Sequence, residues 1–156
     1  MNYDVIIIGA GPGGIFSAYE LARLTKSSGK NVKIAIFEAG APLAERHCPI
    51  DGERVKSCVG CKHCSIMKGF GGAGAFSDGK YNITTQFGGT LHEHIGKKNA
   101  VELMRYVDDI NTTHGGAGTK LYSTANSGIK TLCMQNGLYL LDASVRHLGT
   151  DKNKLI

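Results

Sequence analysis

A glycine-rich turn near the amino terminus, Gly9-Ala10-Gly11-Pro12-Gly13-Gly14, constrains the fold of this chain more than any other stretch. An aliphatic run, Asp4 to Ile8, precedes it and is typical of a strand buried on both faces of a parallel sheet. A helix is predicted to begin at Pro12, with an apolar stripe at helical spacing formed by Ile15, Ala18, Leu21 and Ala22. After a turn at 27–31, the run from Val32 to Glu38 predicts a second strand.

Residues 1–40 therefore predict a strand–helix–strand unit of the right length for a right-handed crossover between parallel strands. This unit places the chain in the α/β class. Because only one such unit is visible, and a doubly wound fold needs two, we expect a partial Rossmann-like fold in a truncated sequence.

The spacing of the turn fits G-x-G-x-x-G, the dinucleotide-binding pattern. Gly9 permits the tight turn, Gly11 lets the backbone approach a pyrophosphate, and Gly14 allows close packing of helix on strand. Main-chain N–H groups at the start of the helix then hold the phosphates. Glu38, at the end of the second strand, is placed to accept hydrogen bonds from ribose hydroxyls. The alternative is a turn whose glycines serve steric needs alone.

Glycine supplies 22 of the 156 residues, a share about twice the usual roughly 7%. A second concentration, Gly69 to Lys80, is too rich in glycine for the interior of a helix or strand. Such a stretch permits the backbone to approach a flat or phosphorylated ligand closely, with Ser77, Asp78 and Lys80 as polar contacts. The alternative is a surface connection without a ligand.

Four cysteines, Cys48, Cys58, Cys61 and Cys64, form a C-x9-C-x2-C-x2-C pattern. The last three have the spacing of a ferredoxin-type iron–sulfur loop. Four thiolates also suit zinc, and a metal-free redox pair or reduced thiols beside a bound ligand are a third interpretation. His47 and His63 are interpreted as solvated loop histidines rather than further ligands.

Residues 97–156 predict a further helical and strand region. A helix is expected from Asn99 to about Thr112, with Asn99 and Glu102 as a capping box. A shorter helix over 127–136 should stop at Gly137, and 138–141 should form a strand. Cys133 is interpreted as a small core residue that shares an apolar face with Ile129 and Leu132.

Charge and hydropathy exclude several classes of partner. The net charge is +5, but the lysines and arginines are scattered, so we expect no nucleic-acid partner. No apolar run reaches the roughly 18 residues that a membrane span needs. The amino terminus lacks the pattern of a signal peptide, so a cytoplasmic location is expected, and there clustered cysteines indicate metal or redox chemistry.

These motifs together resemble a known group of flavoproteins. The run from Asp4 to Gly14, the Cys48-Pro49 pair with the three later cysteines, and the stretch Gly71 to Lys80 resemble the FAD-dependent dehydrogenases of unassigned substrate. That group belongs to the glutathione-reductase-like superfamily of FAD/NAD(P)-binding proteins. The likeness is strong over about residues 3–90, with a further match at 146–151.

The resemblance implies a partial FAD/NAD(P)-binding domain over 1–156, with the dinucleotide unit at 1–40, a cysteine-rich loop at 47–66 and a flavin loop at 69–90. It implies that Gly9, Ala10, Gly11, Pro12, Gly13 and Gly14 surround the FAD pyrophosphate. Glu38 and the adjacent Ala39 would lie at the adenosine ribose, and Arg46 would reach the phosphates. The flavin end would be lined by Gly72, Ser77, Gly79 and Lys80.

The resulting hypothesis is the FAD-binding part of an oxidoreductase whose small-molecule substrate delivers a hydride or two electrons to the flavin. A 4Fe-4S cluster on the cysteines would relay electrons to a partner, and NAD(P)H is a candidate donor. No catalytic residue is identified; Asp78, His92 and His94 are candidates by residue type alone. The alternative is a non-catalytic nucleotide-binding module, or one with a structural zinc site.

Overall fold

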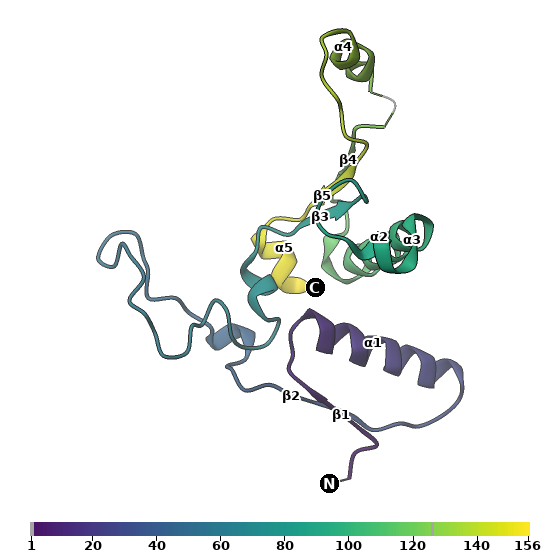
Figure 1. Cartoon of the computed structure of the whole chain (residues 1–156). Helices are drawn as coiled ribbons and strands as arrows, with labels where there is room; N and C mark the ends of the chain where they lie inside the picture. The colour runs from purple at the N-terminus through teal and green to yellow at the C-terminus, as the bar shows by residue number, and fades with distance from the viewer. Residues whose placement is uncertain (1, 126) are drawn as a thin grey trace. The chain divides into compact units, whose positions relative to one another are not determined.

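The computed structural model describes residues 2–125 and 127–156 and has a mixed α/β fold (Figure 1). The chain divides into two compact units, Met1–Phe76 and Ser77–Ile156, and each is described by itself. Among the described helices, none combines the length and the apolar character that crossing a bilayer requires. The boundary between the units falls inside the loop predicted at 69–90.

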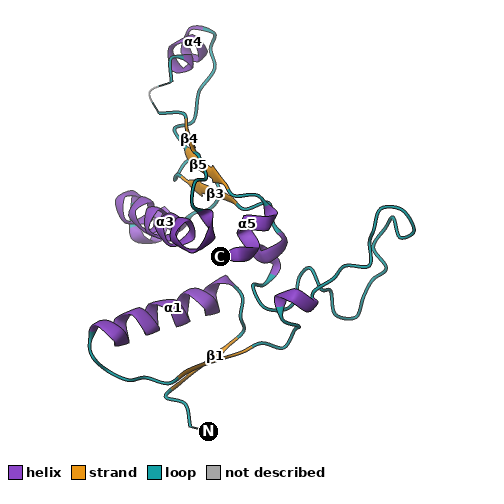
Figure 2. Cartoon of the chain, turned by 180° about the vertical axis from the view of Figure 1, so that it is seen from behind, coloured by secondary structure: helices purple, strands orange, loops and turns teal. Residues whose placement is uncertain are grey.

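The first unit contains the predicted strand–helix–strand arrangement. β1 (Val5–Ile8) and β2 (Ile34–Phe37) pair in parallel, with Val5 opposite Ile34, and α1 (Pro12–Ser27) connects them. α1 contacts both strands, and the two views show it running beside the pair (Figures 1 and 2). The sequence prediction for residues 1–40 is therefore confirmed as secondary structure.

The expectation that the first strand is buried on both faces is wrong for this structure. Side chains alternate along β1 between half-buried and exposed, and Ile8 is 81% exposed. The reason is that a strand presents successive side chains to opposite faces, and α1 contacts this two-stranded pair. Ala22, predicted on the apolar stripe of α1, is exposed as well.

The sequence of residues 40–96 has little periodicity and predicts few regular elements, which holds as far as residue 76 but not beyond, where a strand over Lys80–Ile83 and a helix over Leu91–Ile95 form. Two short 3-10 turns, η1 (Leu43–Glu45) and η2 (Ala73–Phe76), are the regular elements in the described part of residues 38–76. Regular hydrogen bonding resumes in the second unit. Its sheet is antiparallel in the order β3-β5-β4, with β3 (Lys80–Ile83), β4 (Leu121–Ser123) and β5 (Ser144–His147).

The helical elements of the second unit are α2 (Leu91–Ile95), α3 (Lys97–Asn111), the irregular π-type turn η3 (Thr112–Gly116), α4 (Ile129–Gln135) and α5 (Thr150–Leu155). A small apolar core contains Ile83, Ala100, Ile110 and Leu148. Beside it, Arg146 donates to the carboxylate of Asp108 through Nε at 2.7 Å and Nη2 at 2.8 Å. This pair is largely buried, and the hydrogen bond from Arg146 to Asp108 raises the arginine pKa.

The helix predicted over 99–112 is confirmed as α3, but its predicted capping box is wrong. The helix begins at Lys97, and Gly96, with φ +80°, is its N-cap residue. Gly96 also ends α2, so the start of α3 lies two residues before Asn99. The Asn99 side chain instead donates from Nδ2 to the Ile95 carbonyl at 2.8 Å.

α4 confirms one expectation and corrects another. Gly137, with φ +71°, ends the helix, since its N–H donates to the Met134 carbonyl and the Leu138 N–H donates to that of Cys133. The apolar face is not a core, however: Cys133 is only half-buried and Leu132 is 59% exposed. Amphipathic spacing identifies the face of a helix, but no described element packs over this one closely enough to bury it.

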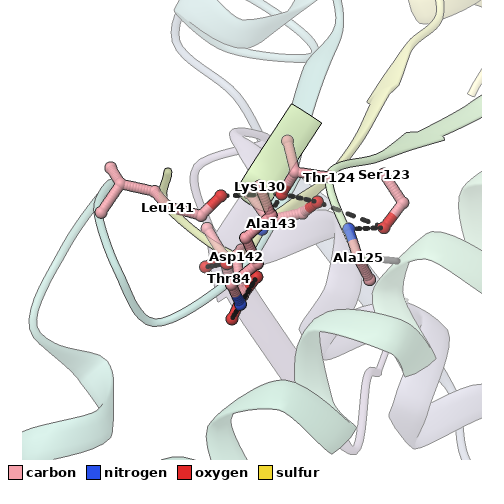
Figure 3. A network of polar contacts seen from close by, with 8 residues as sticks. All are labelled: Thr84, Ser123, Thr124, Ala125, Lys130, Leu141, Asp142 and Ala143. Carbon is pink, nitrogen blue, oxygen red and sulfur yellow. Dashed lines mark hydrogen bonds and ion pairs between the residues drawn. The ribbon is translucent and has the colours of Figure 1, made fainter. Parts of the chain in front are cut away.

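The strand predicted at 138–141 is wrong; pairing starts later, at Ser144. Just before β5, side chains form hydrogen bonds with the main-chain groups of residues 141–143 (Figure 3). The Thr124 hydroxyl donates to the Leu141 carbonyl and accepts the Ala143 N–H, and the Thr84 hydroxyl donates to the Asp142 carbonyl. Lys130 forms an ion pair with the Asp142 side chain at 3.0 Å. These bonds occupy groups that a ladder of strand hydrogen bonds would otherwise use.

Candidate functional site

The turn between β1 and α1 is held by the end of β2. Gly9, with φ +95°, donates its N–H to the Phe37 carbonyl at 2.7 Å. The next residue, Ala10, is fully buried and donates its N–H to Oε2 of Glu38 at 2.8 Å. The two strand ends are therefore linked by backbone and carboxylate together, which positions Gly11 at the head of α1.

The glycines of the turn differ in what a side chain would meet. A Cβ at Gly14 would lie 2.0 Å from the Gly9 carbonyl oxygen, so this position needs glycine for the helix to pack on the strand. A Cβ at Gly11 would meet no protein atom within 4 Å, although Gly11 adopts an ordinary φ of −75°. Neither backbone conformation nor protein packing requires glycine at position 11. The space beside it is open to a ligand.

The start of α1 favours an anion. Gly11 is its N-cap residue, Pro12 occupies the first turn, and that turn contains no acidic side chain. The first N–H groups of a helix have no intrahelical acceptor, and the helix dipole adds partial positive charge there. An α-helix of 16 residues whose first turn is free of carboxylates is thus suited to phosphate groups.

Glu38 combines a structural and a binding capacity. Its Oε2 accepts the Ala10 N–H and its Oε1 accepts the Gly40 N–H, both at 2.8 Å. These bonds, that from Ala10 first, lower the pKa of the Glu38 carboxyl below its ordinary value, so it is ionised at neutral pH. A carboxylate offers about four lone-pair sites, so acceptor capacity remains for sugar hydroxyls. Ala39 follows it and is exposed.

The second glycine loop packs against the first. The Gly71 N–H donates to the Ala10 carbonyl at 2.8 Å. A Cβ at Gly72 would lie 3.2 Å from the Gly11 Cα and 3.3 Å from the Pro12 side chain. The structure therefore brings Gly72, predicted from the resemblance, to the turn at Gly11.

Arg46 has a different environment from the one expected. Its side chain is buried, 2% exposed, and its guanidinium lies 4.7 Å from the centre of the Phe76 ring. Within residues 2–125 and 127–156, its side-chain donors bond to main-chain carbonyls, those of Ser65, Ile66, Phe70 and Gly72. A direct contact of Arg46 with phosphate stays a prediction, while in this structure the side chain holds the loop. No residue type in the sequence signals such a role, because the acceptors are backbone atoms.

The remaining predicted flavin contacts belong to the second unit. Gly79 is buried, with its N–H donated to the Ser77 hydroxyl oxygen at 3.2 Å, while the Lys80 side chain is exposed. Asp78 pairs with Lys80 Nζ at 3.1 Å, and the hydrogen bond from Lys80 lowers the pKa of the Asp78 carboxyl. Their role at the flavin end stays a prediction.

His147, which was not predicted as a site residue, joins this charged group. It lies opposite Lys80 in the β3–β5 register, with Nε2 3.7 Å from the Asp78 carboxylate. The match at 146–151 was the sequence signal that pointed to this segment. His92 and His94 lie on α2, half-buried and exposed respectively, and the structure assigns them no catalytic partner among the described residues.

The cysteines do not form a metal site in this structure. Cys48, Cys58, Cys61 and Cys64 are free and exposed. Within residues 2–125 and 127–156, no group of three or more histidine, cysteine or acidic side chains is arranged to hold a metal ion. The donor set thus does not fit an iron–sulfur cluster or zinc as folded, because a cluster needs its thiolates to converge. Spacing along the chain alone predicted that convergence.

Comparison with known proteins gives one partial match. A stretch of 42 residues, 27% of this chain, is 38% identical to the mitochondrial electron transfer flavoprotein-ubiquinone oxidoreductase of Dictyostelium discoideum. The match spans 7% of the length of that protein. No protein-family model matches the chain, and no solved structure does. The similarity to that oxidoreductase is therefore confined to a short segment of both chains.

The residues of the first unit fit a dinucleotide diphosphate. An open space lies beside Gly11, the start of α1 is free of acidic groups, and Glu38 stands at the end of the neighbouring strand. These are the three features that the G-x-G-x-x-G turn needs for binding: close approach, unpaired N–H donors and a ribose acceptor.

Proposed function

We propose that this chain is the FAD-binding part of a flavin-dependent oxidoreductase, with a partial Rossmann-like fold in the first unit. The observation that carries the proposal is the difference between Gly14, which protein packing requires, and Gly11, which no protein contact requires. The short similarity to an electron transfer flavoprotein-ubiquinone oxidoreductase supports it.

The start of α1, Gly11 and Glu38 each have a role in holding the nucleotide. The first N–H groups of α1 donate to the diphosphate, and Gly11 presents no side chain to obstruct it. Glu38, held ionised by the Ala10 and Gly40 N–H groups, accepts hydrogen bonds from the adenosine ribose. Bound FAD supplies the chemistry, acceptance of a hydride or two electrons from the substrate, while the protein orients it and excludes competing reactions.

Binding is tested by titrating the full chain with FAD and following the quenching of flavin fluorescence. Gly11→Val should weaken FAD binding at least tenfold without loss of helical circular dichroism. A Cβ at this position meets no protein atom within 4 Å, so the new side chain would occupy the space proposed for the diphosphate. The matched control is Gly128→Val, the same substitution at the exposed N-cap residue of α4 in the second unit, where a Cβ also meets no atom within 4 Å. Equal FAD affinity in the parent chain and Gly11→Val would refute the assignment.

Catalysis needs a separate test. The protein, loaded with FAD, is mixed anaerobically with NADH or NADPH and the flavin absorbance near its visible maximum is recorded. Bleaching supports an oxidoreductase with a nicotinamide donor. A bound flavin that neither nicotinamide reduces, and that after chemical reduction passes no electrons to candidate acceptors, indicates the non-catalytic module instead.

The proposed function involves no step at the cysteines, because their donor set does not fit a cluster as folded. The iron–sulfur relay and its redox partner stay predictions. Measurement of iron, acid-labile sulfide and zinc in anaerobically purified protein decides among the three interpretations, since a cluster requires iron and sulfide in equal amounts and a structural site requires about one zinc per chain.

A further inference from the structure

Arg46 carries a full positive charge at a buried position of the first unit. Its side chain is 2% exposed, and a guanidinium cannot lose its proton in a protein. In the part of the chain that the structure describes, no ion pair joins it to a carboxylate. Burial of an unpaired charge is costly, so four carbonyl dipoles and the Phe76 ring provide the compensation.

The four carbonyls come from two places in the sequence. Those of Ser65 and Ile66, at 2.8 and 2.7 Å, directly follow Cys64. Those of Phe70 and Gly72, at 2.6 and 2.9 Å, belong to the second glycine loop. One planar group with its donors in a fixed fork therefore ties the end of the thiol-bearing segment to the glycine loop.

The glycine loop is in turn fixed to the nucleotide turn. Gly71 donates its N–H to Ala10, and Gly72 packs against Gly11. At Gly69, a Cβ would lie 2.7 Å from the Arg46 side chain, so the loop backbone closes directly on the arginine. The contacts thus form a continuous path from the segment at Cys64, through Arg46, to the place where a diphosphate would lie.

We propose that Arg46 is a positioning residue that couples diphosphate binding at the Gly11 turn to the order of residues 64–68. This inference rests on the proposed function, since it requires a nucleotide diphosphate at that turn. An anion there complements the buried charge and stabilises the arrangement of loop 69–72 that Arg46 holds. Because coupling is reciprocal, whatever loosens the segment at Cys64 weakens nucleotide binding to the same extent.

The test uses the full chain with ADP as the diphosphate probe and hydrogen exchange as the second measurement. The Met67 and Lys68 N–H groups donate to the Cys64 carbonyl at 3.1 and 2.9 Å, so their exchange reports opening of the segment. ADP should slow their exchange at least threefold in the parent chain. The Glu53 and Arg54 amides, which donate to the Asp51 carboxylate and do not contact Arg46, should be unaffected.

Arg46→Lys keeps the charge and removes the fork. We expect this variant to bind ADP about tenfold more weakly and to lose the ADP-dependent slowing at 67–68, while Arg54→Lys, at an exposed arginine of the same unit, changes neither quantity. A purely structural role would lower the melting temperature yet leave the ADP affinity of the folded protein unchanged. Unchanged affinity and unchanged slowing in folded Arg46→Lys would overturn the inference.

Two further results are decisive. If Arg46→Lys does not fold, the parent chain alone decides: equal slowing by ADP at 53–54 and 67–68, or none at 67–68, contradicts the coupling. If the parent chain binds neither ADP nor FAD, the proposed function itself is refuted, which distinguishes that failure from a failure of the coupling.

Discussion

At the scale of single residues, the roles of the turn glycines follow from their local geometry, and this makes Gly14 a test of the packing argument. Gly14→Ala places a methyl group 2.0 Å from a backbone oxygen that cannot move without shifting β1 or α1. We expect a loss of roughly 1–3 kcal/mol in the free energy of unfolding, as for overpacking elsewhere. Urea denaturation followed by circular dichroism measures it. Gly13→Ala, where the methyl group meets open space, should be neutral or slightly stabilising.

Glu38 gives a residue-scale prediction for pH dependence. Its pKa in the folded chain lies below the ordinary value of 4.5, chiefly because the Ala10 N–H donates to it. A lowered carboxyl pKa contributes stability above the ordinary value, and this contribution is lost as the pH falls through the lower pKa of the folded state. Stability should therefore fall less between pH 7 and pH 3 in Glu38→Gln than in the parent chain.

Urea midpoints at the two pH values provide the measurement for Glu38. Glu53→Gln, at an exposed position of the same unit, is the matched control and should keep the parent's pH dependence. An equal change of the urea midpoint between pH 7 and pH 3 in the parent chain and in Glu38→Gln would contradict the role of these hydrogen bonds.

The sequence predicted the turn at this scale because glycine has few reasons to occur at three fixed positions after a strand. It did not predict the environment of Arg46. The partners of that side chain are carbonyls 19–26 residues further along the chain, and a carbonyl is present at every residue, so no pattern of residue types marks them. The same applies to His147, which joins Asp78 through strand register.

At the scale of elements, prediction succeeded where a segment carries its own periodicity or an aliphatic run. β1, α1, β2 and α3 are such segments, and each was found within a few residues of its expected bounds. β5 has no such signal, because its four residues, Ser144–His147, do not form a hydrophobic face. The strand is held by hydrogen bonds to two neighbouring strands and by the bond from Arg146 to the Asp108 carboxylate. The segment 138–141, where a strand was predicted, is more apolar than β5. Its pairing is prevented by side chains, because the Thr124 and Thr84 hydroxyls donate to the carbonyls of Leu141 and Asp142.

The buried ion pair makes the contribution of α3 to β5 testable. Asp108→Ala leaves the Arg146 guanidinium buried without its carboxylate, and removal of one partner of a buried pair costs roughly 3–5 kcal/mol. We expect a loss of that size in the free energy of unfolding, measured by urea denaturation. The double variant Asp108→Ala/Arg146→Met removes both charges and should recover part of the loss. A double variant less stable than Asp108→Ala would show that Arg146 contributes mainly through its bond to the Thr119 carbonyl.

At the scale of the whole molecule, the two units differ in how they are stabilised. Among the described residues, the buried apolar side chains of the first unit are those of two alanines, Ala10 and Ala75, whereas the second unit buries Ile83, Ile110 and Leu148. Burial of a large aliphatic side chain contributes roughly 1.5–3 kcal/mol, and an alanine much less. The first unit therefore depends more on polar contacts, those of Arg46 and Glu38 above all.

This difference predicts the order in which the units open. β1 is hydrogen-bonded to one strand, whereas β5 is hydrogen-bonded on both sides and lies beside the apolar core of its unit. In the chain without nucleotide, the amides of Val5–Ile8 should exchange with solvent faster than those of Ser144–His147, because regions with few buried apolar contacts open with less free energy. Hydrogen exchange followed by mass spectrometry on peptides that cover the two strands measures this order. Slower exchange in β1 than in β5 would mean that the polar contacts around Glu38 and Arg46 stabilise the first unit more than the aliphatic core stabilises the second.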